Sequence, residues 1–538
     1  MSMPSLPNLA QVIAGHAAAT PDLRILTIDT GTNRGDEVRT CRELWDNGRR
    51  LAGALIEHGL APGEHFALLM ANHAEFVEAM IAAGLTATVF VPIDPRTRGD
   101  KLAFMLELAE CKGVIAADYS LGELLQVRPQ LEHCRWVIGV KSGEIAEPVE
   151  SYAGVTDYAR IMEREAVDVA REPPAADSPM QLLFTSGTTG DPKGIVLTHR
   201  RWAEIAALVP MLVGWQADER PYSGLSLTHA NAQVLTLGAC LFKGMPCVLS
   251  RRFTKSRLWD ITRKHRCTTF NLLGGMTTAI FSEPGKPDDA DNPVRVVVSA
   301  GMPVAIWEEF ERRFGVQLLE FYGAAEGGMT FKPIGLGPIG SIGKTVPIFQ
   351  HRIVDAAGND VPPGEPGELL FRATDGSPYV VEYYKNPEAS AKKCAGGWLH
   401  MGDIVREDEN GWLYFLYRQG GGIRRNGDFV NPGFVEKAVA EFETVDDVFV
   451  YGVPASNGAP GEKDVVAAIV LRDAARFDLA ALLAHCSARL DRNAVPSYFQ
   501  VLDAIPKTAS EKPQERFLLE LFDPTAPSVY TEARRART

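Results

Sequence analysis

The feature that most constrains the fold is an alternation between short β-branched runs and longer helical patterns. An apolar run at 23–30 precedes a helical pattern at 42–60, and the same order recurs over 65–71 and 74–94. Similar apolar runs return at 113–118, 246–250, 294–300 and 316–323. Because this alternation is typical of βαβ units, the sequence predicts an α/β fold whose parallel sheets are covered by helices.

The pattern changes in the second half of the chain. Between residues 335 and 384, short strands are separated by Gly and Pro turns, which indicates a small antiparallel β region. A further strand pair runs into three glycines at 420–422, and glycine suits a hinge because it absorbs large backbone rotations. We expect a large N-terminal domain (1–417) of two parallel-rich αβ subdomains plus the antiparallel region, a hinge (418–422), and a small mobile α/β C-terminal domain (423–538).

Composition excludes several classes of protein. The formal net charge is −13, from 55 Lys and Arg against 68 Asp and Glu, so the chain has no general attraction for nucleic acid. Eight cysteines without a CxxC pair argue for reduced thiols rather than a zinc knuckle or a disulfide framework. The sequence has no apolar segment of about 18 residues or more, so we expect no integral membrane segment. We expect a cytoplasmic protein, with the oligomeric state left open and a homodimer as one option.

The stretch 184–194 is the most informative one for chemistry. It follows an apolar strand at 181–184 and combines glycines, small hydroxyl residues and a lysine. In such a loop, N–H and O–H groups turn toward an anion and the lysine adds charge. A solvated turn would need only some of these residues, and the spacing of a Walker A loop is absent. The stretch predicts a phosphate-binding loop made of Thr185, Ser186, Gly187, Thr188, Thr189, Gly190 and Lys193.

This loop resembles TSGTTGxPKG, the phosphate loop of the superfamily of acyl-CoA synthetases, peptide-synthetase adenylation domains and firefly luciferase. Further motifs match the superfamily in the right order over almost the whole chain. The resemblance implies an ATP-dependent acyl-CoA ligase, which uses ATP and Mg²⁺ to activate a carboxylic acid as acyl-AMP and then transfers the acyl group to coenzyme A. It also implies a catalytic role for Thr185.

The segment 322–326 resembles the family's YGxTE motif. The resemblance implies that Tyr322 lies by the adenine, followed by Gly323 and Ala324, and that Ala325 lies at the α-phosphate. It also implies that Glu326 is a catalytic Mg²⁺ ligand, for which a carboxylate is suited because Mg²⁺ takes one or two protein oxygens together with phosphate oxygens. Ala325 stands where the family usually has Thr, so one hydroxyl donor is missing.

A glycine-rich turn at 299–303 is similar to the family segment that packs along the adenine and the acyl pocket. Glycine at this position permits close approach of a ligand. The resemblance implies that Gly301, Met302 and Pro303 contact the nucleotide, and that Ala300 and Gly301 contact the acyl group.

The segment 398–403 resembles WxxTGD, whose Asp accepts hydrogen bonds from the two ribose hydroxyls. A carboxylate suits a diol because it offers two acceptor oxygens, so Asp403 is expected at the ribose. The segment 417–432 resembles the family hinge and the loop after it, which implies that Arg418 contacts ribose and phosphate. Arg424 and Gly427 are then expected near coenzyme A, although a solvated basic pair at Arg424 and Arg425 is an equal alternative.

The segment 506–512 resembles PxTxSGK, which carries the catalytic lysine of adenylate formation. A preorganised cation stabilises charge that develops at the carboxylate and the α-phosphate in the transition state. This resemblance implies Lys512. Glu511 stands in place of the family Gly and Lys507 lies five residues upstream, so an exposed loop lysine at 512 is the alternative.

The acyl pocket is less legible. The segment 226–233 fits a family segment whose His or aromatic residue gates the carboxylate, which implies a catalytic or pocket role for His229, with a core histidine as the alternative. Asn231 and the turn carrying Gly274 and Gly275 are expected to face the acyl group. This segment and the 423–428 loop resemble the carnitine/crotonobetaine-CoA ligase branch more than the long-chain fatty acid enzymes.

Two other functions compete with the CoA ligase. An enzyme of the same fold that loads a carrier protein in trans would share every motif above. A nucleotide-binding homologue without turnover is suggested by the departures at Ala325, Gly421 and Glu511, but the retained Lys193 and Asp403 argue against it.

Overall fold

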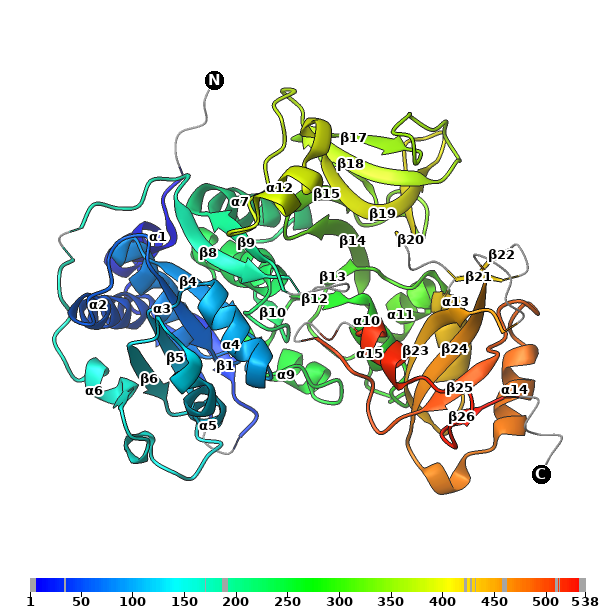
Figure 1. Ribbon diagram of the computed structural model, residues 1–538, viewed down its shortest axis with the longest axis horizontal. Helices are drawn as coiled ribbons and strands as arrows, with labels where there is room; N and C mark the ends of the chain where they lie inside the picture. Colours follow the sequence, from blue (N-terminus) through cyan, green and yellow to red (C-terminus); the bar gives the residue numbers. More distant parts are fainter. Residues whose placement is uncertain are drawn as a thin grey trace. The chain divides into compact units, whose positions relative to one another are not determined.

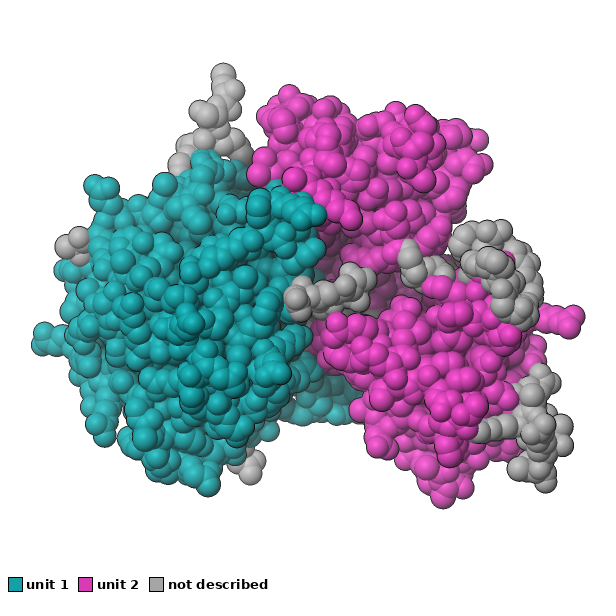
Figure 2. Space-filling model, in the orientation of Figure 1, with its two compact units in different colours: residues 1–187, 191–271, 381–390 teal, residues 188–190, 272–380, 391–538 magenta. Residues whose placement is uncertain are grey.

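The computed structural model describes residues 6–32, 35–169, 171–185, 192–419, 423–425, 428–430, 432–456, 462–508, 511 and 513–531. It divides into two compact units, coloured in Figure 2: unit 1 comprises 1–187, 191–271 and 381–390, and unit 2 comprises 188–190, 272–380 and 391–538. Both units mix helices and strands, which confirms the predicted α/β class (Figure 1). The boundary expected at 418–422 falls within unit 2 and stays a prediction, since residues 420–422 lie outside the described residues.

Unit 1 contains a seven-stranded sheet in the order β7-β6-β5-β3-β4-β8-β9. The strands from β7 to β8 run parallel, and β9 closes the sheet as an antiparallel partner of β8. The bounds of the strands are β3 (His65–Leu69), β4 (Val89–Ile93), β5 (Gly113–Ala117), β6 (Trp136–Val140), β7 (Val155–Asp157), β8 (Pro179–Phe184) and β9 (Gly194–Thr198).

The central strands of this sheet are apolar on both faces, so helices cover both faces. Val91 of β4 packs with α4 (Gly99–Leu108) and α5 (Asp118–Val127), whereas the neighbouring Phe90 meets Phe76 of α3 (Ala74–Thr86) edge to face. Helix α3 packs in turn against α1 (Leu9–Ala19) and α2 (Cys41–Glu57), and α6 (Tyr158–Met162) packs on α2.

A second group of strands in unit 1 runs in the order β12-β10-β11-β1-β2. Strands β1 (Arg24–Asp29), β10 (Pro221–Ser223), β11 (Cys247–Ser250) and β12 (Thr269–Leu273) are parallel, and β2 (Glu37–Thr40) is antiparallel at the edge. The connecting helices are α7 (His199–Val213), α8 (Ala239–Lys243) and α9 (Leu258–His265), with a π-helix, η3, at Asn231–Gly238.

Unit 2 begins with strands β13 (Val296–Ala300), β14 (Gln317–Ala324), β15 (Gly327–Lys332) and β16 (Lys344–Thr345), and with helices α10 (Gly274–Phe281) and α11 (Trp307–Phe314). Strands β13 and β14 are parallel, and the chain then reverses into β15. The small antiparallel region predicted at 335–384 is present as β17 (Phe349–Val354) and β18 (Gly367–Ala373). Its sheet continues beyond residue 384 into the predicted strand pair, β19 (Leu399–Glu407) and β20 (Leu413–Arg418). Helix α12 (Pro387–Lys393) spans the point at which the chain passes from unit 1 to unit 2.

The last part of unit 2 is a small α/β module. Its sheet contains β23 (Val445–Pro454), β24 (Lys463–Leu471), β25 (Tyr498–Val501) and β26 (Val529–Tyr530), preceded by the hairpin of β21 (Ile423–Arg425) and β22 (Asp428–Val430). Alternate residues of β24 face two separate cores: Val465, Ala467 and Ile469 pack with α13 (Pro432–Ala440) and α14 (Leu479–Ser487), and Val466 and Ala468 pack with α15 (Glu515–Leu521). The period of two in the sequence decides this two-sided packing.

None of the helices in the described part of the chain has the length and apolarity needed to cross a membrane. The eight cysteines are free thiols, and six of them are buried.

Candidate active site

The main cluster in unit 2 comprises Tyr322, Asp403 and Arg418, which we call the Tyr–Asp–Arg cluster. Tyr322 on β14 donates its phenol proton to Asp403 Oδ2 at 2.5 Å, and Arg418 Nε donates to Asp403 Oδ1 at 3.0 Å. Asp403 and Arg418 meet because they are register partners on the antiparallel strands β19 and β20. The structure thus brings together three residues that the sequence motifs placed at one nucleotide.

Burial and the charge of Asp403 both affect the pKa values of Tyr322 and Arg418. Asp403 is 4 % exposed, so its carboxylate depends on protein donors. Burial and the neighbouring Asp403 charge raise the pKa of Tyr322, which therefore remains a proton donor. Burial opposes the charge on Arg418, but the carboxylate of Asp403 raises the pKa of Arg418 overall.

Glu320, which the sequence motifs did not identify, supports the glycine-rich turn after β13. Its Oε1 accepts hydrogen bonds from the backbone N–H groups of Gly301, at 2.5 Å, and Met302, at 3.2 Å. Glu320 is 2 % exposed, and burial raises its pKa to about 8 despite these donors. Its register partner on β15 is Lys332, a second buried charged residue. The only signal in the sequence was an acidic residue inside an otherwise apolar strand.

Gly274 and Gly301, two residues predicted to face the acyl group, lie against each other. A Cβ on Gly274 would lie 2.5 Å from the carbonyl oxygen of Gly301, and Gly301 has a φ of 87°, a conformation that favours glycine. The expectation of a turn at Gly274 and Gly275 is corrected, because these residues form the first turn of α10. Helix α10 therefore begins where the backbone of Gly274 lies against the backbone of Gly301.

Glu326 occupies the turn between β14 and β15. Strand β14 extends through Ala324, so Tyr322, Gly323 and Ala324 belong to the strand rather than to the loop after it. The phenol of Tyr379 donates to the backbone carbonyl of Glu326 at 3.2 Å, and Gly327 permits this approach because a Cβ there would lie 1.6 Å from the phenol oxygen. Glu326 thus offers a carboxylate on an anchored turn, which fits the donor type that Mg²⁺ takes in proteins.

In unit 1, the described part of the phosphate-loop motif is limited to its two ends. Thr185 N–H donates to the carbonyl of Lys193 at 2.9 Å, which closes the antiparallel pair of β8 and β9 around the loop. Lys193 is exposed, and its Nζ lies 5.5 Å from the centroid of the Tyr383 ring. Residues 186–191, which include the predicted Ser186, Gly187, Thr188, Thr189 and Gly190, lie outside the described residues.

The segment of His229 in unit 1 leads into the π-helix η3. His229 is half-buried, and its carbonyl accepts the N–H of Gln233 at 3.2 Å as the helix begins. A π-helix is rare and is found frequently at functional sites, because its wider turn displaces side chains from the usual helical spacing. The segment predicted to line the pocket therefore contains a rare element, the eight-residue π-helix η3.

Three neutral side chains of this region form what we call the amide chain: Asn231, Asn271 and Thr236. Asn271 Nδ2 donates to Asn231 Oδ1, and Thr236 Oγ1 donates to Asn271 Oδ1 at 3.1 Å. Asn271 is the middle residue of β12, three residues before Gly274. The sequence motifs identified Asn231 and missed Asn271, which only the pairing reveals.

Several C-terminal predictions fall on residues that the structure does not describe. Lys512 and Gly427 lie outside the described residues, as does the side chain of Arg424. The alternative candidates have structural partners: Arg425 donates to the carbonyl of Val495 at 2.6 Å, and Lys507 pairs with Asp447 at 2.6 Å.

Comparison with known proteins identifies the family of the chain. The model of the AMP-binding enzyme family matches residues 13–383, and the model of the AMP-binding enzyme C-terminal domain matches residues 435–512. A medium/long-chain-fatty-acid–CoA ligase, FadD6, from Mycobacterium tuberculosis is 30% identical over 505 residues, which cover 89% of this chain and 81% of that protein. The crotonobetaine/carnitine–CoA ligase of Salmonella enteritidis is 25% identical over 472 residues, covering 86% of this chain and 89% of that protein.

Among solved structures, an anthranilate CoA ligase, AuaEII, in complex with anthranoyl-AMP superposes with a TM-score of 0.82 at 21% identity, covering 96% of this chain and 98% of that one. At this identity the likeness supports the fold. Taken with the family model and the curated relatives, it confirms the resemblance found in the motifs: the chain belongs to the AMP-binding enzyme family and is an acyl-CoA ligase of the adenylate-forming type.

Proposed function

We propose that this ligase works in two half-reactions, with ribose and adenine held by the Tyr–Asp–Arg cluster and its neighbours. The observation that supports this most strongly is the buried carboxylate of Asp403, fixed by a phenol and a guanidinium. An ionised carboxylate has about four lone-pair sites, of which Tyr322 and Arg418 use two. The remaining acceptor sites suit the two hydroxyls of a ribose.

In the first half-reaction, a carboxylate oxygen of the acid attacks the α-phosphorus of ATP, and the bond from that phosphorus to pyrophosphate breaks. Thr185, Lys193 and the loop between them supply donors and positive charge to the phosphates, and Lys512 supplies a cation at the forming acyl-AMP. Glu326 would hold Mg²⁺, which contributes charge neutralisation at the phosphate oxygens when bound.

In the second half-reaction, the sulfur of coenzyme A attacks the carbonyl carbon of the acyl-AMP. The bond from that carbon to the AMP oxygen breaks, and the thiol proton passes to solvent. Rotation of the domain 423–538 about a hinge at 418–422 withdraws Lys512 and presents Arg424 and Gly427 to coenzyme A, so one active site performs both reactions.

For the acid, we propose a substrate with a polar or charged substituent, as in betaine acids, in preference to an unbranched alkyl chain. The amide chain supports this, because its donors and acceptors on the π-helix would be poor neighbours for a purely apolar tail. His229 and Asn231 are the residues proposed to contact the acid.

The test of this function is acid-dependent release of pyrophosphate across short, fatty, aromatic and betaine carboxylates, with and without coenzyme A, with products identified by mass. A CoA thioester from betaine acids supports the full proposal. Acyl-AMP without thioester indicates a carrier protein as the acceptor, and fatty acids as the best substrates would reject the polar pocket.

A matched pair of lysine variants tests the division into half-reactions. Lys512→Ala is expected to lower acyl-AMP formation by orders of magnitude and to leave thioester formation from pre-made acyl-AMP largely intact. Lys507→Ala is the control, because Lys507 is already paired with Asp447. Equal loss of both half-reactions in Lys512→Ala would contradict the domain rotation.

A further inference from the structure

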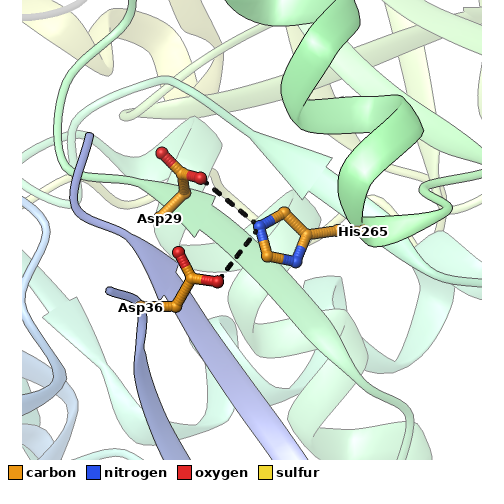
Figure 3. A group of neighbouring side chains, drawn as sticks. All are labelled: Asp29, Asp36 and His265. Carbon is orange, nitrogen blue, oxygen red and sulfur yellow. Dashed lines mark hydrogen bonds and ion pairs between the residues drawn. The ribbon is translucent and has the colours of Figure 1, made fainter. Parts of the chain in front are cut away.

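Three groups of His and carboxylate side chains in the described part of the chain have ligand atoms within 4.8 Å of one another. The first comprises Asp29, Asp36 and His265, whose side chains converge in Figure 3. Lys264 Nζ bonds Asp29 at 2.9 Å and Asp36 at 2.7 Å, and Arg257 also bonds Asp29. A protein ammonium therefore already supplies the positive charge between these two carboxylates.

The second group, Glu37, His73 and Glu75, differs from the first because its central atoms have no hydrogen-bond partner among the described residues. Glu37 Oε2, His73 Nδ1 and Glu75 Oε2 are buried and accept or donate no hydrogen bond among the described residues. His73 is 0 % exposed, and its Nδ1 lies 3.7 Å from Glu75 Oε2. Leaving three buried polar atoms unsatisfied is costly, so this arrangement calls for a ligand.

The geometry of the group suits a small cation. Ligand atoms around a tetrahedral ion with bonds of about 2.05 Å lie about 3.4 Å apart. The separation of 3.7 Å between His73 Nδ1 and Glu75 Oε2 is close to this spacing. Glu37 is on strand β2, and His73 and Glu75 begin helix α3, so the three ligands come from two elements with well-defined backbones.

The outward-facing atoms of the same residues are oriented by a second layer of contacts. Arg251 donates to Glu37 Oε1, and Arg39 donates to Glu75 Oε1 at 3.4 Å. His73 Nε2 lies 3.0 Å from the phenol oxygen of Tyr119. Metal-binding histidines and carboxylates typically have such partners on their second atom, which fix ligand orientation.

The local charge is compatible with a cation. The two arginines oppose it, but Glu37, Glu75 and the fully buried Glu78 supply three carboxyl groups.

We propose that Glu37, His73 and Glu75 form a binding site for a divalent transition-metal ion, with Zn²⁺ as the best fit. One imidazole and two carboxylates favour Zn²⁺ over Mg²⁺, which prefers oxygen ligands alone. The ion would join β2 to the start of α3. Because the adjacent Asn72 bonds the backbone of Leu225 and Leu227, shortly before His229, the site would also stabilise the segment leading to the π-helix.

The test is metal content after chelation and reconstitution of the full chain. The protein is dialysed against a chelator, incubated with Zn²⁺ in excess Mg²⁺, desalted, and analysed by mass spectrometry of metals. We expect one Zn²⁺ per chain and a higher Tm with Zn²⁺ than without it. Glu75→Gln should weaken Zn²⁺ binding by at least about a hundredfold, and Tyr119→Phe by about tenfold or more.

Asp36→Asn is the matched control, because it removes a carboxylate from the group that Lys264 already occupies, and it should bind Zn²⁺ as the unmodified chain does. If Glu75→Gln does not fold, Tyr119→Phe carries the same test with all three ligands retained. The proposal is overturned if the unmodified chain retains no Zn²⁺, or if the Glu75 and Tyr119 variants retain as much as Asp36→Asn. In that outcome, buried water satisfies the three atoms.

Discussion

The Tyr–Asp–Arg cluster of unit 2 and the amide chain of unit 1 hold their side chains in different ways. In the cluster, a buried carboxylate is fixed by charge and by the register of β19 with β20. In the amide chain, neutral side chains of a π-helix and of strand β12 bond one another. In the proposed function, the contacts to ATP are therefore built from charge on regular strands, and the contacts to the acid are built from neutral groups.

The largest expected effect comes from removing the charge at the centre of the cluster. Asp403→Asn keeps the size of the side chain but leaves Arg418 without its counter-charge, so we expect kcat/KM for ATP to fall by about 100-fold or more. Asp360→Asn is the control, because Asp360 forms an exposed pair with Arg352 in the same antiparallel region. Equal effects of the two variants would show that Asp403 has no special role at the ribose.

A second variant tests how the nucleotide side of unit 2 responds to pH. The pKa of Glu320 is about 8 in the folded chain against an ordinary 4.5, so the folded state binds more protons between these values. Stability therefore falls as pH rises from about 5 to 8. Glu320→Gln does not titrate but can still accept both N–H groups. As pH rises over this range, the free energy of unfolding of Glu320→Gln should increase by on the order of 2–3 kcal/mol relative to that of the unmodified chain.

Scanning calorimetry at several pH values measures this difference. Glu311→Gln is the control, because Glu311 also accepts a backbone N–H, from Leu318 at 2.8 Å, but is only half-buried. A pH profile of Glu320→Gln that parallels the unmodified protein would mean that Glu320 is ionised when buried.

On the unit 1 side, Asn271→Leu removes the middle member of the amide chain. We expect the preference for polar over apolar acids, measured as a ratio of kcat/KM values, to change by about tenfold, with ATP affinity unchanged. Thr236→Val removes only the outer bond and should have a smaller effect on this ratio. A change in ATP affinity without a change in acid preference would reverse the proposed division between the two regions.

The smallest effect is expected from Tyr322→Phe, which removes one hydrogen bond to Asp403 and keeps the aromatic ring. The Michaelis constant for ATP should rise about three- to tenfold, since about 0.7 to 1.4 kcal/mol is the net worth of a typical hydrogen bond and Arg418 still holds the carboxylate. Tyr414→Phe is the control, because its phenol bonds Asp408 on the same sheet. A loss as large as that of Asp403→Asn would make Tyr322, rather than the carboxylate, the main contact.

The sequence placed the members of the Tyr–Asp–Arg cluster at one site because they belong to short motifs in a fixed order. Asp403 and Tyr322 were identified although 81 residues separate them. Glu320 was missed because a single acidic residue in an apolar strand carries no motif, and Asn271 was missed because its role depends on a partner 40 residues away. The Gly274 turn was wrongly predicted, since the glycines suggested a loop where the chain continues into helix α10.

The amino-acid sequence by itself determined the alternation of strands and helices, the family, and the positions of the phosphate, adenine and ribose motifs, because each of these is a pattern in neighbouring residues. Only the tertiary structure decided which side chains meet: Asp403 with Tyr322, Glu320 with the turn at Gly301, and Glu37 with His73 and Glu75. The physical reason is that such contacts follow from sheet order and register, which bring together residues whose spacing along the chain carries no signal.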